Sequence, residues 1–149
     1  EPAGIGPDLG VLLAEKHLNK NTIIIGDPDL LNNSAKKLKK RIKLNVLENI
    51  HSKAINGKGV INLLPHKLQV KNRPGKLNPK NSPYVVNTIR TAANLCLQGD
   101  VSAMVTGPIS KSVLNDAGYS ISGHTEFLAK ICKRKWSCYI FQRTNTRWI

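Results

Sequence analysis

Short apolar runs that end at turn residues alternate with helix-like segments along most of this chain. The clearest run is residues 22–26, TIIIG, a continuous stretch of β-branched residues that ends in glycine. Leucines recur at helical spacing before it, and the sequence DPD after it opens a second amphipathic segment. Isoleucines that do not alternate with polar residues indicate a strand buried on both faces, as in a parallel sheet covered by helices. The pattern therefore predicts an α/β protein.

The same alternation predicts the remaining elements. Strands are expected at residues 22–26, 42–46, 60–64 and 100–105, and helices at 7–18, 28–38, 83–98, 108–116 and 125–132. Gly99 and Gly118 suit the left-handed position past a helix end, and Ser82 and Thr125 suit the cap before a helix. Short connections between alternating strands and helices favour a doubly wound, mainly parallel sheet with helices on both faces.

The net charge of +14 is the strongest feature of the composition. A basic surface is typical of proteins that bind nucleic acids, so a basic nucleic-acid-binding module is one reading. However, the lysines are scattered, and only residues 36–41 form a dense run, without an aromatic platform on which bases stack. This arrangement favours a solvated basic face, and nucleic acid is not the expected partner.

The chain length and the cysteine content narrow the class of protein further. The 149 residues fit one ordinary domain, and no apolar run approaches the roughly 18 residues needed to cross a bilayer. Neither a membrane partner nor a secretion leader is indicated, so a cytoplasmic protein is expected. Cys96, Cys132 and Cys138 are odd in number and form no C-x-x-C pair, which favours three reduced thiols.

The stretch 106–130, TGPISKSVLNDAGYSISGHTEFLAK, holds the candidate site. It begins directly after an expected strand, at the carboxyl edge of the sheet, where open α/β folds bind their ligands. Gly107 lets the backbone approach a ligand, and the Lys111 ammonium adds to the positive amino end of the next helix, which favours an anion. His124 is open to three readings: a donor to phosphate, a metal ligand, or a solvated side chain.

Three segments together resemble the 4-hydroxythreonine-4-phosphate dehydrogenase family of pyridoxal phosphate biosynthesis. They are EPAGIGPDL at the start, AMVTGPISKSVLNDAG in the middle and GHTEFLA soon after, and the match runs in order to about residue 136. The resemblance implies a fold similar to the isocitrate and isopropylmalate dehydrogenases. It also implies NAD-dependent oxidation and decarboxylation of 4-phosphooxy-L-threonine, a phosphorylated small molecule, in a homodimer with a divalent metal ion (Zn, Mg or Co).

The resemblance assigns the site residues one by one. In the family the His-Thr pair of the GHTE motif contacts substrate, which maps onto His124 and Thr125. Lys111 and Asp116 lie in the neighbouring motif and are secondary candidates for a catalytic or supporting part, with no role assigned. No metal ligand and no nicotinamide contact can be carried over, because in the family the metal-binding histidines and most of the nicotinamide contacts lie beyond the matching stretch.

The departures from the family shape the expected domains. Family members are about twice as long, and the tail 138–149, CYIFQRTNTRWI, lacks the apolar strand that the family pattern places there. Residues 1–120 are expected to form a first α/β domain without its first strand, and residues 121–149 the start of a second. The chain is accordingly expected to be a truncated form without activity of its own. The alternatives are the nucleic-acid-binding module and a non-catalytic partner of a full-length homologue.

Overall fold

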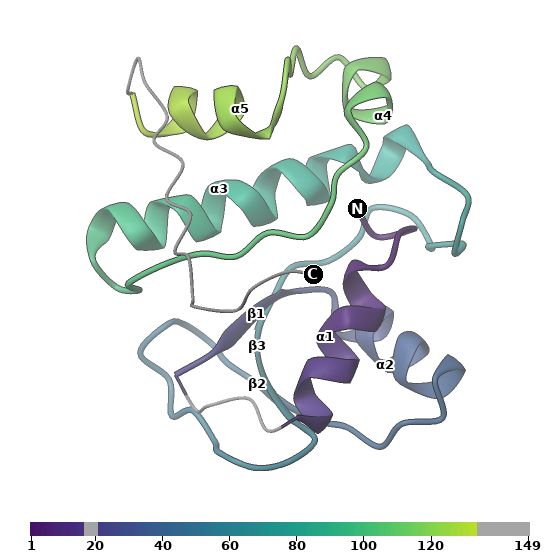
Figure 1. The fold of residues 1–149 in the computed structure, drawn as a ribbon, viewed down its shortest axis with the longest axis vertical. Coiled ribbons are helices and arrows are strands. Elements are labelled where there is room, and N and C mark those ends of the chain that lie inside the picture. Colours follow the sequence, from purple (N-terminus) through teal and green to yellow (C-terminus); the bar gives the residue numbers. More distant parts are fainter. Residues whose placement is uncertain (17–20, 134–149) are drawn as a thin grey trace, which may run out of the picture.

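The computed structural model describes residues 1–16 and 21–133, and the expected α/β class is confirmed (Figure 1). Three strands of the described part form one sheet, in which every pair is parallel. The elements in chain order are α1 (Gly6–Glu15), β1 (Ile23–Gly26), α2 (Pro28–Lys37), β2 (Lys43–Val46), β3 (Val60–Pro65), the 3-10 helix η1 (Pro79–Asn81), α3 (Ser82–Gln98), α4 (Lys111–Asp116) and α5 (His124–Ile131).

The sheet has the strand order β1-β3-β2, so β3, the last strand of the described residues, lies in the middle. Leu63 of β3 lies opposite Ile24 of β1, and Ile61 lies opposite Leu44 of β2. The connection through α2 therefore crosses over the position of β3, as parallel strands require. In Figure 1, α1 and α2 lie together beside the sheet, whereas α3, α4 and α5 occupy the other half of the molecule.

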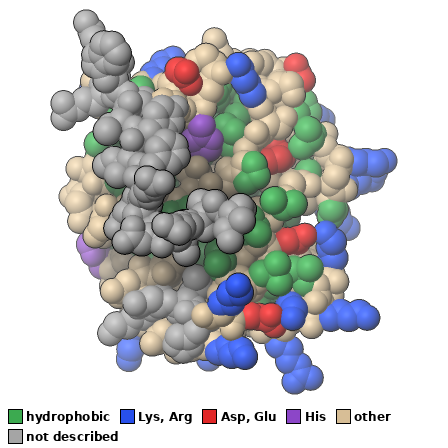
Figure 2. Space-filling model, in the orientation of Figure 1, with side chains coloured by type: hydrophobic (Ala, Val, Ile, Leu, Met, Phe, Trp, Pro, Cys, Tyr) green, Lys and Arg blue, Asp and Glu red, His purple; other side chains and the backbone are tan. Residues whose placement is uncertain are grey.

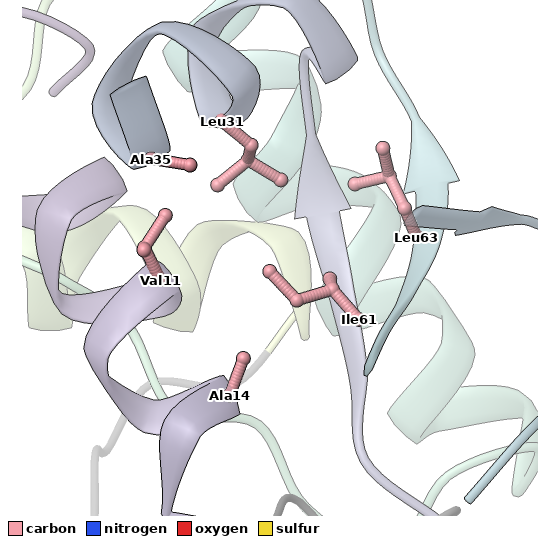
Figure 3. Close-up of a cluster of buried hydrophobic side chains, with 6 residues drawn as sticks. All are labelled: Val11, Ala14, Leu31, Ala35, Ile61 and Leu63. Carbon is pink, nitrogen blue, oxygen red and sulfur yellow. The ribbon is translucent and has the colours of Figure 1, made fainter. Parts of the chain in front are cut away.

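One apolar core joins the sheet to α1 and α2. Successive strand residues point to opposite faces, so Ile61 and Leu63 both face these helices, and each is completely buried. Figure 3 shows their side chains pointing toward those of the two helices. The cluster consists of Val11, Ala14, Leu31, Ala35, Ile61 and Leu63.

A second apolar core lies among α3, α4 and α5. Its buried members are Val85, Val86, Ile89, Leu114 and Ile121, and Phe127, Leu128 and Ile131 of α5 pack against them. The start of α5 is thereby held on α3. The expected domain boundary at residue 120 stays a prediction, and the expected divergent tail, 138–149, lies outside the described residues.

The expected strand at 100–105 is wrong. Residues 101–110 contain no strand, and no neighbouring strand pairs with them in the described part of the chain. Val105 is 99% exposed. An apolar run with β-branched residues needs a partner strand to form ladder hydrogen bonds, and without one its local preference does not produce a strand. The helix that follows also starts later than expected, at Lys111 and not at Pro108.

The two expected glycine helix ends are confirmed. Gly99 follows α3 with φ of 81°, and Gly118 follows the last turn of α4 with φ of 84°. Both angles lie in the left-handed region, which glycine adopts without the steric cost that a side chain imposes.

The two expected serine and threonine caps are wrong. Thr125 is the second residue of α5, and the cap position belongs to Gly123. Ser82 is the first residue of α3, and its hydroxyl donates to Val113 O at 3.3 Å. The buried Ser82 hydroxyl therefore ties α3 to α4, which a local sequence pattern does not show.

The basic run lies partly in ion pairs. Lys37 Nζ lies 2.9 Å from the Asp8 carboxylate, and Lys40 Nζ lies 2.9 Å from the Glu15 carboxylate, so both cations link the region of α2 to α1. Figure 2 shows Lys and Arg side chains around the rim of the visible face, with Asp and Glu among them. This distribution fits a solvated basic face.

Two further sequence expectations can be compared with the structure. No helix in the described ranges is both long and apolar enough to cross a membrane. Cys96 and Cys132 are free thiols, and Cys138 lies outside the described residues.

Candidate functional site

Two loops far apart in the sequence lie side by side at the start of the chain. Glu1 N donates to Pro108 O at 3.2 Å. A methyl group placed on Gly107 would lie 3.8 Å from the Gly6 Cα, which is ordinary van der Waals contact. The loop of residues 1–6 therefore lies against the turn that precedes α4.

His124 belongs to the same neighbourhood. Its Nε2 atom is buried and has no hydrogen-bond partner in the described part of the chain. Burial lowers the pKa of the His124 imidazole, and Glu1 N lies near it. Glu1 thus touches Pro108 and lies near His124, which brings the two predicted site regions together. A neutral imidazole with an unpartnered buried nitrogen offers one directional hydrogen bond to a ligand.

Lys111 lines a cleft of about 420 Å³ beside α4. The cleft is formed by Lys111, Asn115, Gly118, Tyr119, Ser120, Ile121 and Ser122. Asn115 Oδ1 accepts from Ile121 N at 3.0 Å, which fixes the connection that leads to His124. The ammonium and the serine hydroxyls are donors that suit an anion.

The other sequence candidates take different places. Thr125 is half-buried in the first turn of α5, next to His124. Asp116 is exposed at the end of α4 and does not line the cleft beside Lys111. The four candidates therefore fall on two neighbouring helices, with His124 and Thr125 on α5.

Sequence reasoning missed the residues that hold the loop of residues 1–6 in place. Asn72 Nδ2 donates to Pro2 O at 2.9 Å, and Gly75 N donates to Ala3 O at 2.9 Å. The only local signal was the turn-forming sequence NRPG, which gives no sign of a contact some 70 residues away.

The described residues do not fit a metal centre. In the two described ranges, no three His, Cys, Asp or Glu side chains are placed to hold a metal ion. We therefore assign no metal ligand and derive no chemical step through a metal from these residues.

The lowered pKa of His124 predicts a pH-dependent stability. The unfolded chain takes up a proton near the ordinary value of 6.5, whereas the folded chain takes it up only at a lower pH. The contribution of His124 to the free energy of unfolding is then fully present above pH 6.5. It falls as the pH is lowered from there to the pKa of His124 in the folded chain. Urea unfolding at a series of pH values measures this slope. His124→Gln should remove its part of the slope, and an unchanged slope would contradict the assignment.

Comparison with known proteins places the chain in a family. Residues 18–149 match the family model of the pyridoxal phosphate biosynthetic protein PdxA. The chain belongs to the PdxA family. Curated PdxA relatives named 4-hydroxythreonine-4-phosphate dehydrogenase include one from Methylococcus capsulatus, 44% identical over 131 residues, and one from Citrobacter koseri, 41% identical over 127 residues. These alignments cover 88% and 85% of this chain.

Solved PdxA structures share the fold. A 4-hydroxythreonine-4-phosphate dehydrogenase from Klebsiella pneumoniae superposes with a TM-score of 0.80 at 30% identity, covering 89% of this chain and 42% of that one. The chain spans about 40% of the length of the curated relatives it matches. The resemblance inferred from the three sequence segments is confirmed.

Proposed function

We propose that this chain supplies part of the substrate site of a 4-hydroxythreonine-4-phosphate dehydrogenase. The observation that carries the proposal is the buried, unpartnered Nε2 of His124, beside the loop of residues 1–6 and the turn at Gly107. The relatives carry the name of this activity. The ligand is 4-phosphooxy-L-threonine, which presents a phosphate, a hydroxyl group and an amino acid to the site.

The proposed reaction is oxidation of the substrate's secondary alcohol to a ketone, after which the β-keto acid loses carbon dioxide. NAD⁺ would supply the acceptor for the hydride, with the hydroxyl proton released to solvent, and a divalent ion (Zn, Mg or Co) would supply polarisation of the hydroxyl oxygen; no described residue of this chain is assigned to hold either group. The residues of this chain bind and orient the substrate. His124 Nε2 bonds a polar substrate atom, Thr125 adds a hydroxyl beside it, and the Lys111 ammonium attracts the phosphate.

The environment of His124 suits this role. Because burial lowers its pKa, the imidazole is neutral in the free protein near pH 7. A bound phosphate would favour the charged form and raise that pKa. Substrate binding is therefore coupled to proton uptake below neutral pH.

Several properties implied by the family form part of the proposal. They are a homodimer, a cytoplasmic location, and a first domain that ends near residue 120. Asp116 lies at the exposed end of α4, and we assign it a supporting role without direct contact with the substrate.

A ligand titration of the chain tests the proposal. NMR spectra recorded with 4-phosphooxy-L-threonine should show saturable shifts of the His124 and Thr125 signals, and L-threonine should not reproduce them. His124→Ala should weaken binding by roughly 10- to 100-fold, because a hydrogen bond to a charged group contributes about 1.5–3 kcal/mol. His51→Ala, an exposed histidine on another loop, serves as the control and should leave affinity unchanged. Absence of saturable shifts at millimolar ligand would reject the proposed function.

A further inference from the structure

The segment that joins β3 to η1 is anchored to two buried side chains. Leu68 N donates to Asp27 Oδ2 at 2.9 Å, and Val70 N donates to Asn81 Oδ1 at 3.0 Å. Asp27 and Asn81 are buried at the starts of α2 and α3. This segment, residues 66–76, is called the strap below. Its first half is thus fixed to the body of the protein.

The second half of the strap holds the loop of residues 1–6. Asn72 Nδ2 donates to Pro2 O at 2.9 Å, and Gly75 N donates to Ala3 O at 2.9 Å. Gly75 has φ of 75°, so the strap turns here through the left-handed region. The two bonds hold consecutive carbonyl groups of the loop, and Ala3 is buried beneath them.

The same loop meets the proposed site. Glu1 N donates to Pro108 O at 3.2 Å, and this end of the loop lies near His124. The loop of residues 1–6 therefore lies between the strap and the site.

The loop does not fix its own position. Its internal bonds, from Gly4 N to Glu1 O and from Ala3 N to Glu1 Oε1, are both 3.3 Å, at the long end for hydrogen bonds. Neither internal bond reaches beyond residue 4. The position of residues 1–4 thus depends on the strap, on Pro108 and on α1, at whose start Ile5 O accepts from Leu9 N at 2.9 Å.

We propose that Asn72 is a positioning residue for the substrate site. Its side-chain amide holds the loop of residues 1–6 where the loop meets Gly107, Pro108 and His124. The ligand named here rests on the proposed function, whereas the placement of the loop does not. A displacement of about 1 Å at a site that must hold its ligand in one geometry can cost roughly 100-fold in function. An effect on ligand binding is therefore expected although Asn72 has no contact with the ligand.

Two substitutions at Asn72 and one control test the proposal. Asn72→Ala removes the amide, and Asn72→Asp keeps the size but removes the donor. Arg73→Ala changes the neighbouring exposed strap residue and serves as the matched control. The readouts are the NMR amide signals of Gly4 and Gly107, the NMR titration of the His124 imidazole, the affinity for 4-phosphooxy-L-threonine and the melting temperature.

Both Asn72 variants should shift the Gly4 and Gly107 signals and raise the pKa of His124 toward its ordinary value, because a displaced loop would leave the site less buried. Affinity should fall by about 10-fold, within the loss expected for a small misplacement. The melting temperature should change little, and Arg73→Ala should leave every readout unchanged.

Unchanged loop signals and an unchanged His124 titration in Asn72→Ala would overturn the proposal. An Asn72→Asp chain that behaves like the parent would also overturn it, because the side-chain N–H donor of Asn72 would then not be what positions the loop. If Arg73→Ala lost as much affinity as the Asn72 variants, the strap would have only a general structural role, and the proposal would also be overturned. If the parent chain binds no ligand, the proposed function fails, and the loop signals and the titration still judge the role of Asn72.

Discussion

The Leu63→Ala chain is expected to unfold with a free energy about 3 kcal/mol lower than that of the parent. Leu63 is completely buried on the central strand and packs against Leu31 of α2. Removing its side-chain carbons loses their transfer free energy and leaves a cavity that the flanking strands can fill only in part, and such changes cost about 2–5 kcal/mol. Urea unfolding followed by circular dichroism measures the loss.

A control on the surface separates burial from residue type. Leu97 of α3 is 58% exposed, so Leu97→Ala should change the stability by less than about 0.5 kcal/mol. The melting temperature of Leu63→Ala should fall by roughly 6–12 °C, as expected for a chain of this size. Equal effects of the two substitutions would show that β3 does not form the centre of the core.

The parallel sheet could be predicted because its signals are local. Residues 22–26 hold a continuous apolar run and residues 60–64 an apolar run interrupted only by Asn62; both are bounded by turn residues, and β1 and β3 lie there. Gly99 and Gly118 were predictable for the same reason, since a left-handed residue after a helix favours glycine whatever surrounds it. Residues 100–105 carry the same kind of local signal, but a strand also requires a neighbour, which local sequence does not encode.

The arrangement of the site depends on contacts between distant segments. The motif residues His124 and Lys111 could be singled out from their residue types and from the family resemblance. That Glu1 lies beside Pro108, or that Asn72 holds Pro2, follows only from the packing of the folded chain. Threonine suits the cap position before a helix, so the sequence predicts Thr125 at the cap of α5, whereas the backbone places Gly123 at that position.

A buried amide on the central strand shows a second limit of the local pattern. Asn62 lies between Ile61 and Leu63 in β3, so its side chain faces the opposite side of the sheet. The residue is only 4% exposed. Its Oδ1 accepts from Ile55 N and from Asn45 Nδ2, both at 2.8 Å, and its Nδ2 donates to Ile55 O at 3.0 Å. The amide thus replaces a strand partner for Ile55 and ties the loop before β3 to the sheet.

Replacing this amide by an apolar group of similar size should be costly. In Asn62→Leu, the Ile55 N–H and C=O groups lose their partner, and Asn45 Nδ2 keeps only Lys53 O. Each buried polar group left unsatisfied costs about 1–3 kcal/mol. Because water can reach part of the loop, we expect a total loss of about 2–4 kcal/mol in the free energy of unfolding.

Asn45→Ala is the matched control for this prediction. It removes one donor to Asn62 Oδ1 and the bond from Asn45 Nδ2 to Lys53 O, but Asn62 Oδ1 keeps Ile55 N, so the expected loss is only about 1–2 kcal/mol. Urea unfolding gives both values, and amide exchange of Ile55 should become faster in Asn62→Leu than in Asn45→Ala. If Asn62→Leu were as stable as the parent, the loop would be held by apolar packing, and the buried amide would not be what fixes the loop on the sheet.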